Sequence, residues 1–375
     1  MALAAALGAR LFVDPRLSPS GKVACATCHD PARAHGPPNG LAVQLAGGDL
    51  RHPGLRAVPS IRYLQAVPAF TEHFFESEEE ADESVDNGAS GGLTWDGRVD
   101  RGKEQARIPL LSDFEMANTS PAMVVSEALA AGYGPDIDAA GGGGAAADPD
   151  RAFATILDAL AIYEQDWRTF YPYTSKYDAW LAGKATLSGA EERGLKLFEA
   201  EDKGNCASCH FSTPGLDGTP PQFTDYGMIA LGLPMNPEIP ANADPAWHDL
   251  GLCGPLRTDL SDVSAYCGLF RTPTLRNVAT RRVFFHNGVL HDLREAVAFY
   301  ATRDTDPGRW YPTLPDGTVV KFNDLPPRYM GNVNMDPPFG GRPGGQPALS
   351  DAEIDDVVAF LGTLTDGWSE PPPQR

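Results

Sequence analysis

The chain has 375 residues, which is enough for two domains that each bury a sizeable core. Its formal net charge of −20 argues against nucleic acid and against anionic membrane surfaces as partners. No apolar run is long enough to cross a bilayer, so no membrane span is expected.

Two short cysteine motifs stand out: Cys-Ala-Thr-Cys-His at 25–29 and Cys-Ala-Ser-Cys-His at 206–210. This is the attachment signature of c-type haem, because one turn of chain presents two sulfurs to the porphyrin vinyl groups and the next imidazole reaches the iron. We therefore expect two covalent haems, with His29 and His210 as proximal ligands. The attaching thiols would be two pairs, Cys25 with Cys28 and Cys206 with Cys209. The alternative is one zinc ion bound by all four thiolates, which gives no reason for either histidine.

The compartment follows from this cofactor. Haem c is normally attached outside the bacterial cytoplasm, although residues 1–8 are too short for a signal peptide and lack its basic start. We therefore expect a mature or recombinant form of an exported, periplasmic protein. Cys253 and Cys267 remain once the haem cysteines are assigned, and in an oxidising compartment we expect them to pair. The alternative is two buried free thiols.

Helical signals dominate the rest of the chain, and no segment alternates convincingly as a strand would. Residues 76–83 form an acidic run that we expect to be a solvated loop, and residues 141–144 are all glycine and predict a surface turn. The pair Asp148–Pro149 marks a helix start. Two capping boxes, Ser188–Glu191 and Ser350–Glu353, begin two further helices that carry apolar residues on one face.

These elements predict an all-α fold of two tandem cytochrome c-like domains, residues 1–186 and 187–375, each with one haem motif. The boundary falls near residues 183–188, after the aromatic-rich stretch Trp167–Trp180. The 34 prolines and 39 glycines imply long irregular loops between the helices. We expect the two haems to face a shared interface and the C-terminal tail to be able to pack back on the first domain.

Four further motifs occur in order around the haem segments. They are Leu-Phe-Val-Asp-Pro-Arg-Leu-Ser at 11–18, Trp-Asp-Gly-Arg at 95–98, Phe-Arg-Thr-Pro-Thr-Leu-Arg-Asn-Val at 270–278 and Phe-His-Asn-Gly at 285–288. Together they span nearly the whole chain, and the sequence resembles the bacterial di-haem cytochrome c peroxidase and MauG superfamily. The resemblance implies a haem-dependent oxidoreductase whose first haem reacts with hydrogen peroxide.

The resemblance assigns roles around the first haem. Gln105, Pro109 and Glu115 match distal-pocket residues of the family, where Glu115 would move a proton between the peroxide oxygens. The alternative for Glu115 is a structural carboxylate at a helix start before Met116. Trp95 matches a tryptophan that lies between the haems and relays charge, and the alternative is an ordinary core tryptophan.

The second haem is where the family divides into two chemistries. Its peroxidases carry Met fourteen residues beyond the histidine that corresponds to His286, and here that position is Tyr300, as in MauG. Asp292 can cap a helix on which Tyr300 shares a face with apolar residues, so an ordinary core tyrosine is the alternative. As an iron ligand, phenolate oxygen stabilises high-valent iron, whereas a thioether favours the ferrous state.

The sequence departs from the family at the ligand that closes the first haem. The histidine that does so in resting peroxidases corresponds to Leu55, so we expect an open, five-coordinate first haem. His52 is close to this position but out of register. His35 and His73 are predicted to be surface residues.

The family also has a calcium ion between the haems, held by an Asn side chain and two backbone carbonyls. Here Tyr63 occupies the Asn position, and the carbonyls belong to Arg281 and Val283. The side-chain ligand is lost, which leaves calcium an open cofactor.

Two segments are most similar to the MbnH group, the MauG-like enzymes encoded with methanobactin systems. They are the cysteine-containing insert 252–268 and residues 300–307. That similarity implies oxidation of a tryptophan on a partner protein to kynurenine. The surface relay tryptophan of MauG corresponds to Gly204, so an oxidising equivalent would leave elsewhere, with Trp247, Trp310 and Trp368 as candidates.

The leading interpretation is a periplasmic MauG-like oxidase that uses hydrogen peroxide to form a bis-Fe(IV) state and oxidises tryptophan on a partner protein. The first alternative is a di-haem peroxidase that reduces peroxide to water with electrons from a small cytochrome or cupredoxin. The second is a non-enzymatic electron-transfer protein, which would leave Gln105 and Glu115 without a role and would favour Met or His at the second iron.

Overall fold

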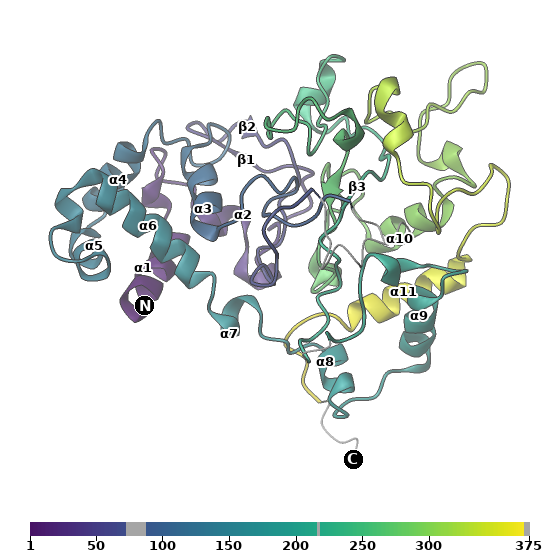
Figure 1. Ribbon diagram of the computed structural model, residues 1–375, viewed down its shortest axis with the longest axis horizontal. Helices are drawn as coiled ribbons and strands as arrows, with labels where there is room; N and C mark the ends of the chain where they lie inside the picture. The colour runs from purple at the N-terminus through teal and green to yellow at the C-terminus, as the bar shows by residue number, and fades with distance from the viewer. Residues whose placement is uncertain (73–87, 216–217, 371–375) are drawn as a thin grey trace.

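The structure is a computed structural model that describes residues 1–72, 88–215 and 218–370. Figure 1 shows two groups of helices, with the N-terminal helices at one end of the molecule and the C-terminal helices at the other. Long irregular segments run between and around them, as the proline and glycine content predicts. The acidic run 76–83 lies outside the described residues.

The first group of helices is built around the crossing of α1 and α6. Its members are α1 (Ala2–Val13), α2 (Cys25–Cys28), α3 (Gly102–Leu111), α4 (Pro121–Ala130), α5 (Gly134–Gly141) and α6 (Pro149–Tyr163). Helix α6 begins where the Asp148 side chain accepts hydrogen bonds from the backbone N–H groups of Asp150 and Arg151, as predicted. A side chain at Gly8 would come within 2.0 Å of the Ala159 carbonyl oxygen, so only glycine lets the two helices approach this closely.

The second group repeats this arrangement with α9 and α11. Its helices are α9 (Gly189–Glu199), α10 (Leu293–Thr302) and α11 (Asp351–Gly362), and the short helices α7 (Trp167–Phe170) and α8 (Lys176–Leu181) connect the groups. Helices α9 and α11 begin at the predicted capping boxes of Ser188 and Ser350. Gly194 packs against α11 as Gly8 packs against α6, because its Cβ would lie 2.0 Å from the Asp356 carbonyl oxygen.

Strands in the described residues form two short antiparallel ladders. Strand β1 (Leu45–Ala46) pairs with β2 (His52–Pro53), and β3 (Met228–Ile229) pairs with β4 (Phe270–Arg271). The expectation of an all-α chain therefore holds only in part. Helices dominate the regular structure, but β3 and β4 form part of the wall of a cavity of about 1020 Å³.

Two hydrophobic clusters form the main cores. The first gathers buried side chains between residues 7 and 170, and the second gathers buried side chains between residues 177 and 364. The chain end then contacts the first half again, because the Tyr63 hydroxyl donates a hydrogen bond to Asp366 Oδ1 at 2.7 Å and Arg62 pairs with the same carboxylate. The division into domains at residue 186 remains a prediction.

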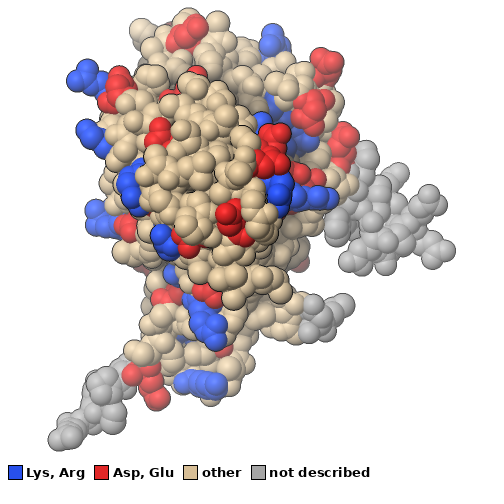
Figure 2. Space-filling view, turned by 90° about the vertical axis from the view of Figure 1, so that its left-hand side faces the viewer, with Lys and Arg blue, Asp and Glu red and all other residues tan. Residues whose placement is uncertain are grey.

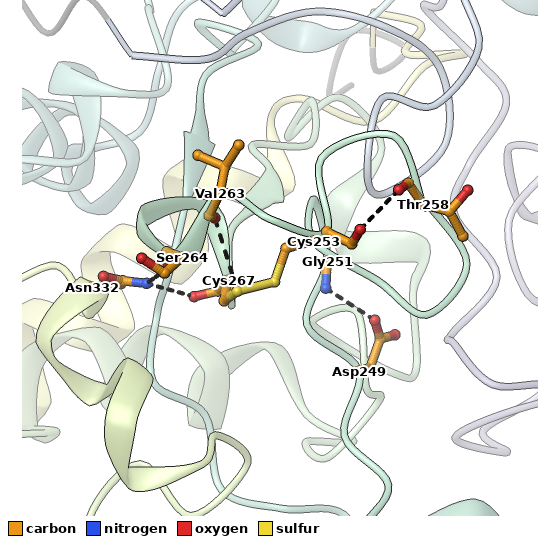
Figure 3. Close-up of a disulfide and its surroundings, with 9 residues drawn as sticks. Asp249, Gly251, Cys253, Thr258, Val263, Ser264, Cys267 and Asn332 are labelled. Carbon is orange, nitrogen blue, oxygen red and sulfur yellow. Dashed lines mark hydrogen bonds between the residues drawn. A yellow bond between two sulfur atoms is a disulfide. The ribbon is translucent and has the colours of Figure 1, made fainter.

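A disulfide closes the insert that precedes β4. It joins Cys253 and Cys267, whose Cα atoms are 5.0 Å apart. Figure 3 shows the bridge beside Asn332, whose side-chain amide donates hydrogen bonds to the carbonyl oxygens of Cys267 and Ser264. The two cysteines that the haem motifs leave over are thus bonded to each other.

Charged side chains of both signs are interspersed on the face shown in Figure 2, at the end of the molecule where the first helix group lies. The net charge of −20 therefore does not gather into one acidic patch on this face. In the part of the chain that the structure describes, no helix has both the length and the apolar character that crossing a membrane requires.

Candidate functional site

The first cysteine motif forms a single helical turn. Helix α2 holds Cys25 and Cys28, and the Thr27 hydroxyl accepts a backbone hydrogen bond at the start of the turn. His29 follows directly, and its Nδ1–H donates to the His35 carbonyl oxygen at 3.1 Å. This bond leaves Nε2 for a metal, and burial lowers the pKa of His29 to about 4, so the imidazole is in the neutral form that binds iron.

The second motif repeats this geometry around the 3-10 turn η4 (Cys206–Ser208). The His210 N–H bonds back to the Cys206 carbonyl oxygen at 2.8 Å, and its Nδ1–H donates to the Phe223 carbonyl oxygen at 2.9 Å. Burial lowers the pKa of His210 to about 4. Nowhere in the described residues do three Cys, His, Asp or Glu side chains gather as a metal site, so the alternative of a single four-thiolate zinc site is wrong.

A cavity of about 1020 Å³ lies beside the second motif. Its walls include Cys206, Cys209, His210 and, from α10, Tyr300. The Tyr300 hydroxyl makes no hydrogen bond with the residues that the structure describes, while its ring stacks on Phe339 with centroids 5.4 Å apart. Burial raises the pKa of Tyr300 above its ordinary value. The cavity is large enough for a porphyrin, and His210 and Tyr300 present iron-ligating groups to it.

Two guanidinium groups that line this cavity have no carboxylate within hydrogen-bonding distance among the described residues. Arg271 donates from Nε to the Thr94 carbonyl oxygen at 3.2 Å, and Arg281 donates from Nε to the Val283 carbonyl oxygen at 3.1 Å. Burial lowers the pKa of both side chains to about 10. Because partly buried cations without anions are costly, the cavity suits a ligand that carries carboxylates, as the two propionates of haem do.

Trp95 also lines the cavity and is tied to His286 through one residue's backbone. The Trp95 Nε1–H donates to the Ala57 carbonyl oxygen at 2.8 Å, and the Ala57 N–H donates to the His286 carbonyl oxygen at 2.7 Å. The two rings meet edge to face with centroids 6.5 Å apart. His286 stacks on Phe270 at 3.4 Å, and its buried Nε2 makes no hydrogen bond in the described structure, although Asp324 Oδ2 lies 3.4 Å away. The ring contact with His286 and the hydrogen bond to Ala57 therefore hold Trp95 in place at the cavity wall.

Sequence reasoning missed an ion-pair network behind this wall. Arg56 contacts Asp249 (Nη2 to Oδ1, 2.7 Å) and Asp96 (Nη1 to Oδ2, 2.7 Å), and Arg98 also pairs with Asp96. Burial by itself would raise the pKa of Asp96, but Arg56 and Arg98 hold it below the ordinary value. Arg56 and Asp249 are 193 residues apart, so no local pattern could reveal the pair, and the only signal was the position of Asp96 next to Trp95.

Of the three predicted distal residues, Glu115 lies close enough to the first motif to act on the Cys28 thiol. Gln105 and Pro109 are on α3, where Pro109 lacks the N–H that would bond to the Gln105 carbonyl. Glu115 lies in the turn after this helix, with Oε2 buried and without a hydrogen-bond partner in the described structure. Burial raises its pKa, and its charge adds to the effect of burial in raising the pKa of the Cys28 thiol to about 12. Helix α4 begins only at Pro121, so the helix-start alternative for Glu115 is wrong.

One of the histidine predictions is wrong. His35, expected at the surface, is 1% exposed, because its ring packs against Phe170 and Phe12 with centroids 4.6 and 5.8 Å away. Its backbone carbonyl is also the group that orients the proximal imidazole of the first motif. His52 is exposed, and His73 lies outside the described residues.

The positions of the family calcium site do not fit a calcium ion. The hydroxyl of the buried Tyr63 is bonded to Asp366, and the Val283 carbonyl already accepts a hydrogen bond from Arg281. The Asn oxygen is thus replaced by a bonded phenol, and a cation already contacts the Val283 carbonyl, so no role is assigned to calcium.

The fold and these sites define a haem-dependent oxidoreductase with two haem centres. Each motif presents two thiols and a neutral imidazole, and a buried carboxyl group without a partner lies near the first of them. Known proteins agree with this class. The sequence profile of the family described as "Di-haem cytochrome c peroxidase" matches residues 2–186.

The methylamine utilization protein MauG of Paracoccus denitrificans is 35% identical to this chain, over 98% of the chain and 89% of that protein. The chain belongs to the di-haem cytochrome c peroxidase and MauG family. Its members are enzymes, so the non-enzymatic alternative is set aside.

Solved structures have the same fold. The diheme peroxidase BthA from Burkholderia thailandensis, in a variant with a tyrosine replaced by methionine, gives a TM-score of 0.86 at 40% identity, over 98% of this chain and 86% of that one. A MauG-like protein associated with microbial copper homeostasis gives 0.65 at 25% identity, over 98% and 90%. Neither comparison confirms the expected placement in the MbnH group.

Proposed function

We propose that this protein is a periplasmic MauG-like oxidase with one haem bound covalently to each cysteine motif. Hydrogen peroxide would react at the first haem and leave a two-electron-oxidised state shared by both haems. A tryptophan on a partner protein would supply two electrons in each turnover and so restore the resting state. If the activity follows the MbnH group, kynurenine would form over two such turnovers, because opening the indole ring to N-formylkynurenine removes four electrons and takes two oxygen atoms from water. Hydrolysis then releases formate and leaves kynurenine. The haems, when bound, supply the redox chemistry, and the protein orients them and moves protons and electrons.

The observation that carries this proposal is the position of Tyr300. It lines the same cavity as His210, and its hydroxyl has no hydrogen-bond partner among the described residues, so it would be available to bind the iron of a haem there. Because burial raises the pKa of Tyr300, a phenolate would form there only when a cation such as iron binds it. Anionic oxygen is a harder ligand than the Met sulfur of the peroxidases and favours more oxidised iron.

Glu115 would hold and transfer the proton at the first haem. A buried carboxyl oxygen without a partner and a raised pKa are the properties of a general acid–base that works near neutral pH. Gln105 and Pro109, from the helix that precedes it, would shape the rest of the distal pocket.

Trp95 would relay electrons between the two haems. Its N–H donates to the Ala57 carbonyl oxygen, which is not a base, so an oxidised Trp95 would keep its proton and could be reduced again without a proton transfer. The edge-to-face contact with His286 and the buried ion pairs of the neighbouring Asp96 support a fixed ring orientation.

Trp310 is the best supported of the three candidate exits for an oxidising equivalent. Its ring centroid lies 5.4 Å from that of Phe299, which is next to Tyr300 on α10. It also lines a separate cavity of about 580 Å³. In the described structure neither Trp247 nor Trp368 has a ring contact of this kind.

A second candidate function is the di-haem peroxidase that takes electrons from a small cytochrome or cupredoxin. The 40% identity with BthA, named a diheme peroxidase, favours it. So does Gly204, at the relay position of MauG, because a side chain there would come within 2.6 Å of the Leu197 carbonyl oxygen.

Peroxide titration of the holo-protein, followed by near-infrared spectroscopy, separates the two functions. Charge resonance between two oxidised haems should give a near-infrared band that decays when a protein tryptophan is oxidised. Fast turnover with a reduced cytochrome or cupredoxin and no such band would identify the peroxidase instead. Covalent attachment is tested by denaturation, after which the protein should keep its haem colour on a gel and the added mass of two haems.

A further inference from the structure

Arg281 is a partly buried cation that joins the two halves of the chain through backbone oxygens. Its Nε donates to the Val283 carbonyl oxygen and its Nη2 to the Val58 carbonyl oxygen, both at 3.1 Å. Val58 is 223 residues away in the chain. Arg281 makes no ion pair with the residues that the structure describes, and burial alone lowers its pKa, to about 10. Arginine keeps its proton at such a pKa, so the charge is permanent near neutral pH.

This guanidinium belongs to the surroundings of both haem sites. It lines the cavity that contains His210, and it is close enough to His29 to add to the effect of burial in lowering the pKa of that imidazole. A Cβ on Gly36, in the first half of the chain, would lie 3.7 Å from its Nη1. The positive charge of Arg281 therefore lies close to both haem sites, which belong to different halves of the sequence.

Two of the three oxygens of the family's calcium site are replaced or already bonded in this chain. Calcium takes about six to eight oxygen ligands. The Val283 carbonyl is bonded to the guanidinium, and the Tyr63 hydroxyl donates to Asp366 Oδ1 at 2.7 Å while it accepts from the Tyr173 N–H at 3.1 Å. A calcium ion at the Val283 carbonyl would lie next to the guanidinium that bonds to the same oxygen, and the two cations would repel each other.

We propose that the Arg281 guanidinium replaces the inter-haem calcium ion of the family, so that this chain works without calcium. It would serve as a positioning residue in two ways. Its hydrogen bonds would tie Val58 to Val283, and its charge would balance haem propionates and act on the potential of the first haem. The guanidinium needs a propionate as its counter-ion because the two carbonyl dipoles compensate a partly buried charge only in part.

The first test is on calcium itself and uses the holo-protein. Metal analysis after purification should find calcium well below one ion per chain, and excess EGTA should change neither the absorption spectra of the haems nor the temperature of unfolding. One tightly held calcium per chain, or a spectrum that EGTA alters and calcium restores, would overturn the proposal. Neither measurement involves a protein substrate, so the proposal stands or falls separately from tryptophan oxidation.

The second test is on the side chain. Arg281→Met removes the charge and keeps most of the bulk, and Arg282→Met, at the exposed neighbouring position, is the matched control. The oxidised haem carries one more positive charge than the reduced haem, so removing a nearby cation stabilises the oxidised form. Arg281→Met should therefore lower the reduction potential of the first haem, and loss of its hydrogen bonds should lower the unfolding temperature. Arg282→Met should change neither.

Arg281→Lys covers the case in which the Met variant fails to fold. Lysine keeps the charge but lacks the fork that reaches two carbonyls. We expect it to keep the potential of the first haem close to that of the wild type and to lower the unfolding temperature. A Met variant with the potential and stability of the Arg282→Met control, or a Lys variant with unchanged stability, would contradict the assigned role.

Discussion

Replacing Glu115 with Gln tests proton transfer at the first haem. Glu115→Gln keeps the size of the side chain but removes its ability to take up or release a proton at the buried Oε2 position. General acid–base catalysis by one residue contributes about 100-fold to 10,000-fold. We therefore expect the reaction with peroxide to slow at least about 100-fold, which corresponds to about 2.7 kcal/mol in activation free energy.

The pH dependence gives this variant a second signature. Burial raises the pKa of Glu115 above its ordinary value of 4.5, and Ser112 and Arg98 oppose that shift. If the ionised carboxylate first accepts a proton from peroxide, the wild-type rate should rise with pH through the raised pKa. The Gln variant should show a low rate without this rise. Its free energy of unfolding should change by only about 1 kcal/mol, because the amide can pair with the Ser112 hydroxyl, which also lacks a partner in the described structure.

Stopped-flow absorption of the first haem, after mixing holo-protein with peroxide at a series of pH values, measures both effects. Asp113→Asn is the matched control, since it neutralises an exposed carboxylate two residues earlier in the same turn and should react like the wild type. A Glu115→Gln protein that keeps both haems and reacts at the wild-type rate would refute the proton-transfer role and leave Glu115 a structural residue.

Three further predictions concern the second haem and the stability of the fold. Tyr300→Met should raise the reduction potential of the second haem and abolish the near-infrared band, while peroxide turnover with small reductants survives. Redox titration and near-infrared spectroscopy measure these changes. A variant that keeps the band would contradict ligation of the iron by Tyr300. Replacing Cys253 and Cys267 with Ser opens a loop with a sequence separation of 14 and should lower the free energy of unfolding by about 3 kcal/mol without loss of haem, as denaturant titration would measure. Burial raises the pKa of Glu164 from 4.5 to about 8, so the folded state holds a proton that the unfolded state releases, and stability should fall by up to about 1.4 kcal/mol per pH unit between pH 4.5 and 8. Glu164→Gln should remove that fall, and a variant that loses stability as steeply as the wild type would show that another group titrates.

The haem motifs and several helix starts could be predicted from the sequence because their signals are local. Each cysteine motif is one turn closed by its own backbone, as in the His210 N–H bond to the Cys206 carbonyl oxygen. Ser188 and Ser350 cap the helices that follow them directly. The helix that carries Tyr300 could be predicted because Asp292 caps it directly, while the role of Tyr300 as an iron ligand stays a prediction.

Only the tertiary structure decided which polar groups are buried and what they pair with. His35 looks like a surface residue in the sequence, but Phe12 and Phe170 enclose it. The bond from Arg281 to the Val58 carbonyl joins segments 223 residues apart, and no local pattern in the sequence indicates it. Desolvation and Coulomb energies depend on distance through space, not along the chain, so the charge state of a site is known only once the distant segments that enclose it are known.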